Sequence, residues 1–490
     1  APDGPLMRLM GFERQRGFAR LEGEGPLGAW HGGFEAGLEG YASLESDVTL
    51  TEDEALRILL DGQANLRGLE EESLGALAGD TPRFRISALW DKDETLVIDS
   101  MRLDGRALTL VFDGALKAAS GGIGGDLALS LKEDAQLDAL APGASIGKAA
   151  VNASLSGSLP WPDVAAQLEG DALAVEGFSA EKLSADLTIK RRRSLIGADG
   201  AQRDILLFAT LEGAKSTEFE LPGGGLVTAR AEGIFNPQEE ALTDGLIALE
   251  GLGARLDGTG QFHLAEESGE ADLRLSAENL AFFAPMAGVD LSGAGEARFD
   301  LSMPGPEENT RFGLSAVLKE FGTGIEAVDA LTGGSLKLRA EGEQLADGAF
   351  TFPEIEAEAA HLSLEGGFDA NARGVLGGQY RFDVPRMQVL NDALGARFDG
   401  PLAVKGDVSG TGASPATSGE VSLAGAGTGD LMFSSLRLRF DGENLLAAPQ
   451  GGLRLSGQSE GGPLNASLRY RVTEDVMRLA DMSLSLGAAN

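Results

Sequence analysis

Side chains able to perform acid–base or metal chemistry are scarce in this sequence. Its 490 residues include three histidines, His31, His263 and His361, and no cysteine. Histidine is the side chain that titrates near neutral pH, and cysteine thiolates are nucleophiles and zinc ligands. The sequence therefore predicts no catalytic residue, no metal site and no cofactor. An enzyme would need a pocket that joins His263 or His361 to carboxylates.

Four short motifs match known sites by residue type but lack the elements that those sites need. Gly143–Gly147 fits G-x-S-x-G, yet a strand pattern follows the serine where a nucleophile elbow requires a helix. Gly23–Gly28 and Gly322–Ala327 fit the dinucleotide fingerprint without a βαβ context, and chance matches are expected among 70 glycines. Gly121–Asp126 resembles one calcium-binding nonapeptide, a motif that works only in tandem.

Charge narrows the possible partners. The formal net charge is −36, which should repel a phosphate backbone and argues against nucleic acid as a partner. The one basic cluster, Lys190–Arg193, is either a solvated turn or a contact for anionic lipid head groups or an acidic surface. No segment reaches the roughly 18 apolar residues that a transmembrane helix needs.

Alternation with a period of two dominates the chain. Gly125–Leu131, Leu183–Ile189 and Ala271–Leu275 carry apolar residues at every second position. As strands, these segments have one apolar and one polar face. Asp-Gly pairs such as Asp257-Gly258 follow such segments and are typical of antiparallel hairpins. The pattern recurs in Ala297–Met303, Leu362–Leu364, Tyr380–Val384, Leu436–Phe440 and Leu468–Val472.

Helical patterns are few. Residues 51–62 begin with capping-box spacing at Thr51 and Glu54, and residues 70–78 and 133–141 are further expected helices. No linker-like segment interrupts the strand pattern. The expected parts are a weakly patterned Gly-rich segment 1–40, a β-rich segment with those helices at 41–145, and continuous β repeats at 146–490.

The strand count sets the expected architecture. At ordinary strand and turn lengths the chain supplies on the order of 35 strands. A sheet of that size twists and curls with its apolar faces inside. It either closes into a row of packed domains or stays open, and an inner set of mostly Leu, Ala and Val favours the open form. We therefore expect an all-β fold: a long, twisted, mostly antiparallel sheet curled into an elongated, taco-like hydrophobic groove, with a few short helices.

The candidate lining residues of this groove are apolar members of the alternating segments. The charged and hydroxyl residues between them are expected to face solvent. The candidates are Leu127, Leu129, Leu131, Leu183, Leu187, Ile189, Leu273, Leu275, Phe299, Leu301, Leu336, Leu338, Leu362, Leu364, Phe382, Val384, Leu436, Leu438, Phe440, Leu468 and Tyr470.

One part of the chain resembles a repeat unit of the TamB/AsmA-like family. The resemblance is carried by Leu137–Pro142, an alternating run to Gly157, Pro160, Leu168–Leu173 and Leu183–Leu187. In looser form, the resemblance covers most of the chain, from about residue 40 onward. Looser copies lie at Ala271–Leu338 and Tyr380–Phe440.

The resemblance implies a fold, a location and partners. Such proteins fold as a taco-shaped β-groove, are anchored in the inner membrane and cross the periplasm. They meet an Omp85-type outer-membrane barrel (TamA-like) and are implicated in moving phospholipid and assembling outer-membrane proteins. This chain looks like an internal portion, so we expect the inner-membrane anchor and the barrel contact to lie in regions outside it.

The expected function is therefore a non-enzymatic periplasmic lipid conduit. Phospholipid acyl chains would move along the hydrophobic groove between the inner and outer membranes of a Gram-negative cell, in support of outer-membrane biogenesis. The alternative is a secreted β-rich passenger or adhesin, which would bury its apolar faces in a closed core.

Overall fold

The computed structural model divides the chain into two compact units. Unit 1 comprises Ala1–Gln238 and Leu246–Leu252, and unit 2 comprises Glu239–Gly245 and Gly253–Asn490. The division falls within strand β17 (Ala241–Gly251). The residues that the structure describes are 17–26, 28–38, 42–53, 55–66, 78–91, 95–117, 120–131, 135–136, 144–159, 161–175, 177–192, 202–216, 225–428, 431–473 and 476–487.

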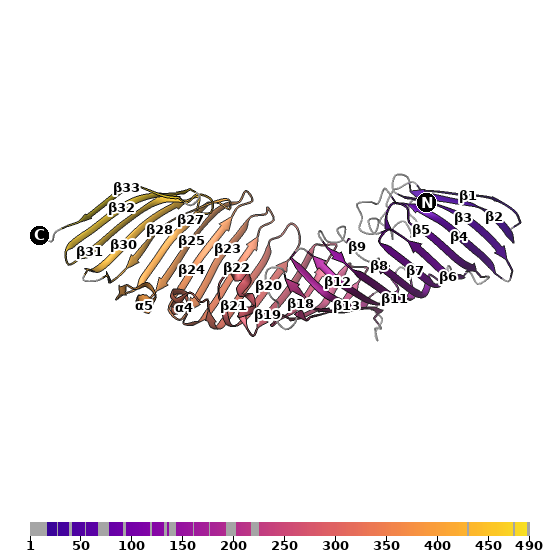
Figure 1. The fold of residues 1–490 in the computed structure, drawn as a ribbon, viewed down its shortest axis with the longest axis horizontal. Coiled ribbons are helices and arrows are strands. Elements are labelled where there is room, and N and C mark those ends of the chain that lie inside the picture. The colour runs from indigo at the N-terminus through magenta and orange to yellow at the C-terminus, as the bar shows by residue number, and fades with distance from the viewer. Residues whose placement is uncertain are drawn as a thin grey trace. The chain divides into compact units, whose positions relative to one another are not determined.

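Unit 1 is an antiparallel sheet whose strands follow one another in sequence order (Figure 1). Its strands are β1 (Gly17–Glu24), β2 (Ala29–Leu38), β3 (Ala42–Glu52), β4 (Leu56–Asn65), β5 (Arg83–Trp90), β6 (Thr95–Asp104), β7 (Leu108–Lys117), β8 (Gly122–Leu131), β9 (Ala135–Gln136), β10 (Ser145–Ile146), β11 (Lys148–Ser158), β12 (Asp163–Val175), β13 (Phe178–Arg191), β14 (Arg203–Glu212), β15 (Lys215–Ser216) and β16 (Val227–Asn236). Pairings run from β1 to β8, pass to β11, and continue through β14 to β16.

Unit 2 repeats this arrangement. Its strands are β18 (Ala254–His263), β19 (Ser268–Ala277), β20 (Ser292–Met303), β21 (Thr310–Gly322), β22 (Gly334–Gln344), β23 (Phe350–Ala359), β24 (Ser363–Ala370), β25 (Val375–Val384), β26 (Arg397–Phe398), β27 (Leu402–Thr411), β28 (Ser414–Leu423), β29 (Ala426–Thr428), β30 (Leu431–Glu443), β31 (Gln450–Ser459), β32 (Gly462–Thr473) and β33 (Val476–Leu486). Antiparallel pairings connect them in order, with β26 and β29 as short additions.

Three short helical insertions share one margin of the sheet in unit 2. They are η3 (Leu280–Phe283) with α3 (Ala284–Ala287), α4 (Glu326–Thr332), and η4 (Met387–Leu390) with α5 (Asn391–Leu394). They follow β19, β21 and β25, which run in the same direction because neighbouring strands are antiparallel. Each ends at a glycine with positive φ, Gly288, Gly333 or Gly395, which ends a helix without steric cost. Figure 1 shows α4 and α5 at this margin.

Each sheet has an apolar face and a polar face. In β4, Leu56, Ile58 and Leu60 are half-buried, whereas Arg57 and Leu59 on the other side are exposed. Two adjacent leucines thus differ in exposure because they point to opposite faces. Side chains converge on the inner side of a curled sheet and diverge on the outer side. The apolar face is therefore the inner one.

The sheets are open. Within neither unit do the described pairings join the first strand to the last. The all-β, antiparallel, open-sheet fold with few short helices that the sequence predicts is confirmed, and closed packed domains are not what the described residues form.

The predicted helix at 51–62 is wrong. Thr51 lies in β3, and Leu56–Asn65 is the strand β4, paired with β3 and β5. The apolar spacing from Leu56 to Leu60 fits both the helical and the strand period. Pairing with the neighbouring strands stabilises the strand. The predicted helix at 70–78 lies outside the described residues except for Ala78, and within 133–141 the described pair Ala135–Gln136 is a strand.

The predicted boundaries at 40/41 and 145/146 do not separate the units. Strands β2 and β3 pair across the first position, and β10 contains the second. The Gly-rich segment 1–40 contributes two regular strands, β1 and β2. The division into compact units falls within β17.

Candidate functional site

Apolar side chains line up across the strands of unit 1. Two rows run from β1 to β16, and neither contains a charged residue. The first row is Leu21, Phe34, Ser46, Gly62, Phe84, Leu103, Leu110, Leu129, Val151, Leu168, Ala185, Ala209 and Ala229. The second row is Gly23, Gly32, Val48, Leu60, Ile86, Met101, Phe112, Leu127, Ala153, Ala166, Leu187, Leu207 and Ala231.

Unit 2 has the same kind of rows. One runs from β18 to β33 and a second from β19 to β32. The first is Leu256, Leu275, Ala297, Ala316, Leu338, Ala357, Leu364, Phe382, Val404, Val421, Leu438, Leu455, Ala466 and Leu484. The second is Leu273, Phe299, Leu314, Ala340, Ile355, Gly366, Tyr380, Gly406, Gly419, Phe440, Leu453 and Leu468.

The register places the candidate residues of each unit on its apolar face. In unit 1 these are Leu127, Leu129, Leu131, Leu183, Leu187 and Ile189. In unit 2 the strand residues are Leu273, Leu275, Phe299, Leu301, Leu336, Leu338, Leu364, Phe382, Val384, Leu436, Leu438, Phe440, Leu468 and Tyr470.

Two candidates do not line an open surface. Val384 is fully buried, at 0% exposure, in a cluster with Met387 and Leu390 of η4. Leu362 lies in the connection from β23 to β24 and packs against the same cluster. Val384 as a lining residue is therefore a correction, because helices that follow β21 and β25 fold over that end of the apolar face.

Part of the apolar face is accessible, although Val48 and Ala153 in the rows of unit 1 are buried. Leu275, Leu314 and Leu338 are 39%, 42% and 36% exposed, although they stand in the uninterrupted rows of unit 2. A packed core would bury such side chains almost completely. The described part of unit 2 thus presents leucine side chains that its own atoms leave partly uncovered.

Aromatic rings on this face lie across glycines. A Cβ added at Gly342 would stand 2.5 Å from the Phe312 ring and 3.0 Å from the Phe352 ring, and these two rings contact edge to face with centroids 5.3 Å apart. A Cβ at Gly419 would stand 2.7 Å from the ring of Phe440 on the adjoining strand. Glycine thus leaves each ring the space that a Cβ would otherwise occupy.

The lining residues predicted from the sequence include neither these glycines nor any residue of β1 to β6. The alternation of Leu56, Ile58 and Leu60 is a sequence signal for the apolar face of β4. The glycines carry no such signal, because their role depends on which aromatic residue the register places beside them.

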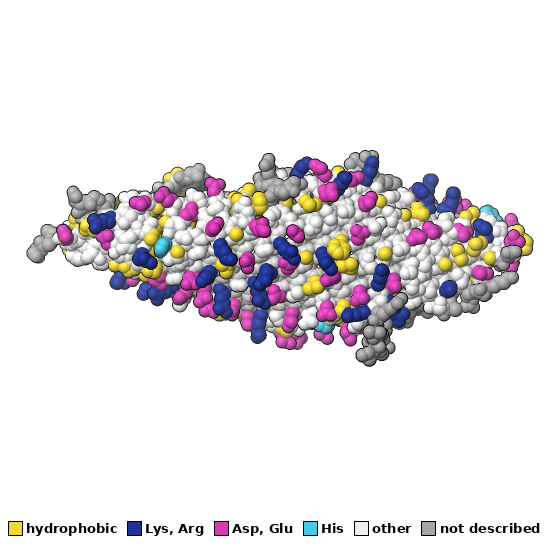
Figure 2. Space-filling view, turned by 90° about the horizontal axis from the view of Figure 1, so that it is seen from below, with side chains coloured by type: hydrophobic (Ala, Val, Ile, Leu, Met, Phe, Trp, Pro, Cys, Tyr) yellow, Lys and Arg dark blue, Asp and Glu magenta, His cyan; other side chains and the backbone are white. Residues whose placement is uncertain are grey.

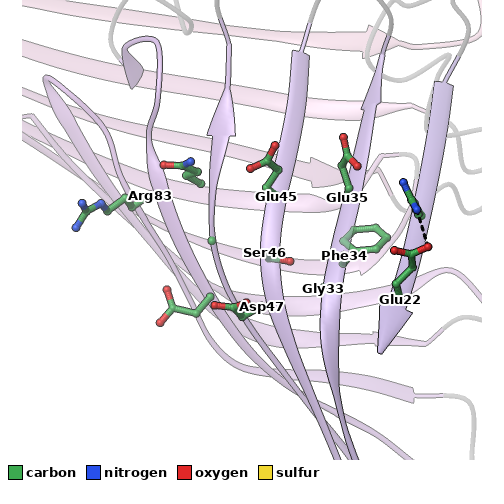
Figure 3. Close-up of a pocket in the computed structure, with 12 residues that line it drawn as sticks. Glu22, Gly33, Phe34, Glu35, Glu45, Ser46, Asp47 and Arg83 are labelled. Atoms are coloured by element: carbon green, nitrogen blue, oxygen red, sulfur yellow. Dashed lines mark hydrogen bonds and ion pairs between the residues drawn. The ribbon is translucent and has the colours of Figure 1, made fainter. Parts of the chain in front are cut away.

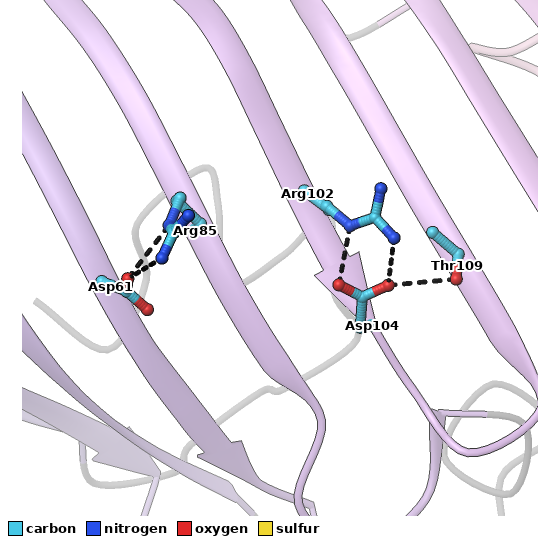
Figure 4. Close-up of polar contacts among 5 residues, drawn as sticks. All are labelled: Asp61, Arg85, Arg102, Asp104 and Thr109. Carbon is cyan, nitrogen blue, oxygen red and sulfur yellow. Dashed lines mark hydrogen bonds and ion pairs between the residues drawn. The ribbon is translucent and has the colours of Figure 1, made fainter.

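The polar face carries ion pairs two residues apart on the same strand. Arg102 Nε lies 2.7 Å from Asp104, whose other oxygen accepts from Thr109, and Arg85 pairs with Asp61 on the neighbouring strand (Figure 4). The same Arg-x-Asp/Glu spacing pairs Arg20–Glu22, Arg230–Glu232, Arg255–Asp257, Arg298–Asp300, Arg339–Glu341, Arg381–Asp383 and Arg397–Asp399.

Arginine holds two carboxylates of the polar face toward their charged form. The hydrogen bond from Arg255 holds the pKa of Asp257 below its usual value, and the bond from Arg439 lowers the pKa of Glu420. In each Arg-x-Asp/Glu motif the middle residue points to the apolar face. The motif therefore builds a neutralised, hydrated face and an apolar face at once. Figure 2 shows a surface of this charged kind, with basic and acidic side chains interspersed.

A concavity on the polar face of unit 1 is rich in carboxylates. It has a volume of about 680 Å³ and includes Glu22, Glu35, Glu45 and Asp47 (Figure 3). No group of acidic, histidine or cysteine side chains in the described residues has the geometry to hold a metal ion. The carboxylates here are solvating charge in an open hollow.

The other sequence motifs do not form sites. His31 Nδ1 lies 3.1 Å from Thr49 Oγ1, and His263 and His361 lie far from it in sequence, in unit 2. Ser145 lies in β10 and strand β11 follows it, so the nucleophile elbow is absent. Gly322 precedes α4, but β21 and β22 are antiparallel neighbours and form no βαβ unit.

The residues of the remaining motifs that the structure describes lie in or next to strands. Gly121–Asp126 leads into and forms part of strand β8. Arg191 ends β13 and its amide donates to Asp163, and Arg192 lies 3.9 Å from Asp204. Arg193 lies outside the described residues. Gly23 is in β1 and Gly28 precedes β2, so no helix follows that fingerprint.

Comparison with known proteins adds no relative. No protein-family model, curated protein or solved structure matches this chain. Among the described residues no helix has the length and apolar character to cross a membrane.

Proposed function

We propose that this protein carries the acyl chains of phospholipids along the apolar faces of its β-sheets. The observation that supports it most directly is the set of charge-free rows that cross the strands of each unit and remain partly accessible, as at Leu275 and Leu338. A function of this kind needs no catalytic residue, metal or cofactor.

The energetics favour such a surface for lipid movement. Exposing one CH₂ group to water costs about 0.8 kcal/mol, so a chain of ~16 carbons faces roughly 13 kcal/mol on leaving a membrane. An apolar row without a charged residue removes most of that cost at every step.

The location and partners that we propose rest on the resemblance to the TamB/AsmA-like family. The protein would act in the periplasm, tethered to the inner membrane, and deliver phospholipid toward an Omp85-type outer-membrane barrel. Both the anchor and the barrel contact would lie in regions outside this chain. Outer-membrane biogenesis, including protein assembly, is the process that such a conduit would support.

The alternative, a secreted passenger or adhesin, requires a closed apolar core. Leu314 at 42% exposure argues against it, because a closed core would cover that side chain. Lipid transport is therefore the better supported function.

The first test is capture of lipid by a photoreactive residue. A crosslinker at Leu127 or Leu129, on the apolar face of β8, should capture phospholipid in cells, because both side chains stand in the charge-free rows. The matched control is Ser130, which is exposed on the polar face of the same strand. Mass spectrometry of the products and of the purified protein measures the lipid.

Equal capture at Ser130 and Leu129 would contradict the proposal. So would a purified protein that carries no phospholipid when it is released from native membranes without detergent exchange.

A further inference from the structure

The polar face of β31 to β33 lacks an ion pair that recurs in unit 2. Among the described residues, five arginines of unit 2 pair with a carboxylate two residues later, as in Arg255 with Asp257 at 2.7 Å. On β31, β32 and β33 the residue in that second position is Ser456, Arg471 or Ala480. The carboxylate that would neutralise each guanidinium is therefore missing from the strand.

Arginines also stand directly opposite one another here. Arg439 of β30 pairs in register with Arg454 of β31, and Arg471 of β32 pairs with Arg478 of β33. Like charges directly opposite each other on one face destabilise a sheet. Glu420 offsets the charge of Arg439, because Arg439 Nε lies 3.0 Å from its carboxylate. Among the described residues no such ion pair is found for Arg454, Arg471 or Arg478.

The nearby carboxylates are already engaged. Asp481 lies 3.8 Å from Arg469 Nε, Asp441 accepts the amide of Gly452 at 3.1 Å, and Glu443 accepts a side-chain amide at 3.4 Å. A neutral amide donor leaves the charge of a carboxylate in place, but neither Asp441 nor Glu443 forms an ion pair with Arg454, Arg471 or Arg478 in the described part of the chain.

Three arginines in this region have no acidic partner in the described part of the chain. Arg471 Nε donates to the amide oxygen of Gln450 at 2.9 Å, a neutral acceptor. No ion pair joins Arg454, Arg471 or Arg478 to a carboxylate there. In a chain with a net charge of −36, arginines thus outnumber carboxylates in the lining of this part of unit 2.

These side chains share a hollow. A concavity of about 720 Å³ on this part of unit 2 has four arginines and three carboxylates among its lining residues: Arg454, Arg469, Arg471, Arg478, Asp441, Glu443 and Asp481. It contrasts with the concavity of unit 1, whose charged lining is mainly carboxylate. Guanidinium groups are planar forks that bind phosphate oxygens in pairs, and several converging on one hollow favour an anion with more than one charged oxygen.

We propose that Arg454, Arg471 and Arg478 form a binding site for a phosphate-bearing anion. The phosphate belongs either to lipid head groups at the surface of an anionic bilayer or to a free phosphate compound. The site lies on the face opposite the apolar rows, so its ligand does not occupy the acyl-chain surface. The proposal therefore stands or falls independently of lipid transport.

The test uses the full chain and two probes. Calorimetric titration with pyrophosphate measures binding of a free anion. Flotation with vesicles of phosphatidylcholine alone, or of phosphatidylcholine and phosphatidylglycerol in equal parts, measures binding to lipid head groups. Acyl-chain uptake by the apolar face is common to both vesicles, so only the difference between them reports on this site.

The site variant is Arg454→Gln/Arg471→Gln/Arg478→Gln. The matched control is Arg255→Gln/Arg298→Gln/Arg339→Gln, which removes the same charge from arginines that already pair with carboxylates. We expect the site variant to bind the preferred probe at least about tenfold more weakly, from the loss of charge-assisted hydrogen bonds. The control should bind as the unaltered protein does.

Each outcome has a fixed meaning. Pyrophosphate binding assigns the site to free phosphate compounds, and binding to the anionic vesicles alone assigns it to head groups. Binding of neither probe, or equal loss in both triple variants, would overturn the proposal. The single variant Arg454→Gln, which relieves repulsion from Arg439, provides the same comparison if the triple variant fails to fold.

Discussion

Glycine at position 406 leaves space for a tyrosine ring on the apolar face of unit 2. A Cβ there would stand 2.5 Å from the backbone oxygen of Ser418 and 2.6 Å from Tyr380 Oη, which also contacts Thr417 Oγ1 at 3.0 Å. We therefore expect Gly406→Ala to displace the ring, break this hydrogen bond and lower the free energy of unfolding by about 1–3 kcal/mol. Urea unfolding of unit 2 measures the effect.

The control for this substitution is Gly412→Ala. No heavy atom lies within 4 Å of a Cβ added at Gly412, in the turn between β27 and β28. Equal losses in the two variants would mean that the alanine acts through general strand or turn propensity and not through the ring.

A carboxylate on the polar face predicts a pH effect. Glu420 accepts from Arg439 and lies 3.3 Å from Arg437, and the first bond lowers its pKa below the ordinary value of 4.5. Because the folded pKa is the lower one, the stabilisation is present above pH 4.5 and is lost as the pH falls through the folded pKa. Glu420→Gln should reduce the dependence of Tm on pH in that acidic window.

Thermal melts between neutral and acidic pH measure this effect. Glu358→Gln is the control, since Glu358 lies 3.3 Å from Lys337 on an exposed part of the same face and accepts from that one cation. A Glu420→Gln protein whose Tm falls with acidification as steeply as the unaltered protein would contradict the prediction.

At the scale of elements, the helical insertions act as a cover for one end of the apolar face. Leu390 of η4 is 5% exposed and packs with Val384 and Met387. Leu390→Ala should therefore cost about 2–5 kcal/mol of unfolding free energy, from lost burial and the cavity that remains. Chemical denaturation followed by circular dichroism measures it.

The neighbouring Leu394 gives the comparison. It ends α5 and is 52% exposed, so Leu394→Ala should change stability by much less. If both leucines cost the same, the insertion would not be anchored through the cluster around Val384.

At the scale of the whole molecule, the charge-free rows are the feature on which lipid transport depends. Leu275→Arg places a cation in the first row of unit 2 between Leu256 and Ala297. Because a charge is costly beside hydrocarbon, we expect phospholipid recovered with the protein to fall by at least about tenfold. Quantitative mass spectrometry of bound lipid measures it.

Its control is Ser276→Arg, one residue further along β19. Ser276 points to the polar face and pairs in register with Glu296, so the added cation meets a carboxylate. Lipid occupancy should stay as in the unaltered protein. Similar lipid loss in both variants, or none with Leu275→Arg in a folded protein, would count against transport along this face.

The face of each strand follows from the sequence wherever alternation is clean. Gly125–Leu131 places Leu127 and Leu129 on one side because a strand has only two sides. Alternation fails at 51–62, where the run around Leu59 suits a helix as well as a strand. It also says nothing about Val384, which alternates like its neighbours but lies under η4.

The residue pattern alone indicates an all-β protein whose strands have one apolar and one polar side, with few side chains suited to catalysis. It does not indicate that Leu275 and Leu438 share one row, that glycines make room for aromatic rings, or that Arg471 lies opposite Arg478. Side-chain alternation is a local property of the chain, whereas register is set by pairing between strands and by the turns that join them.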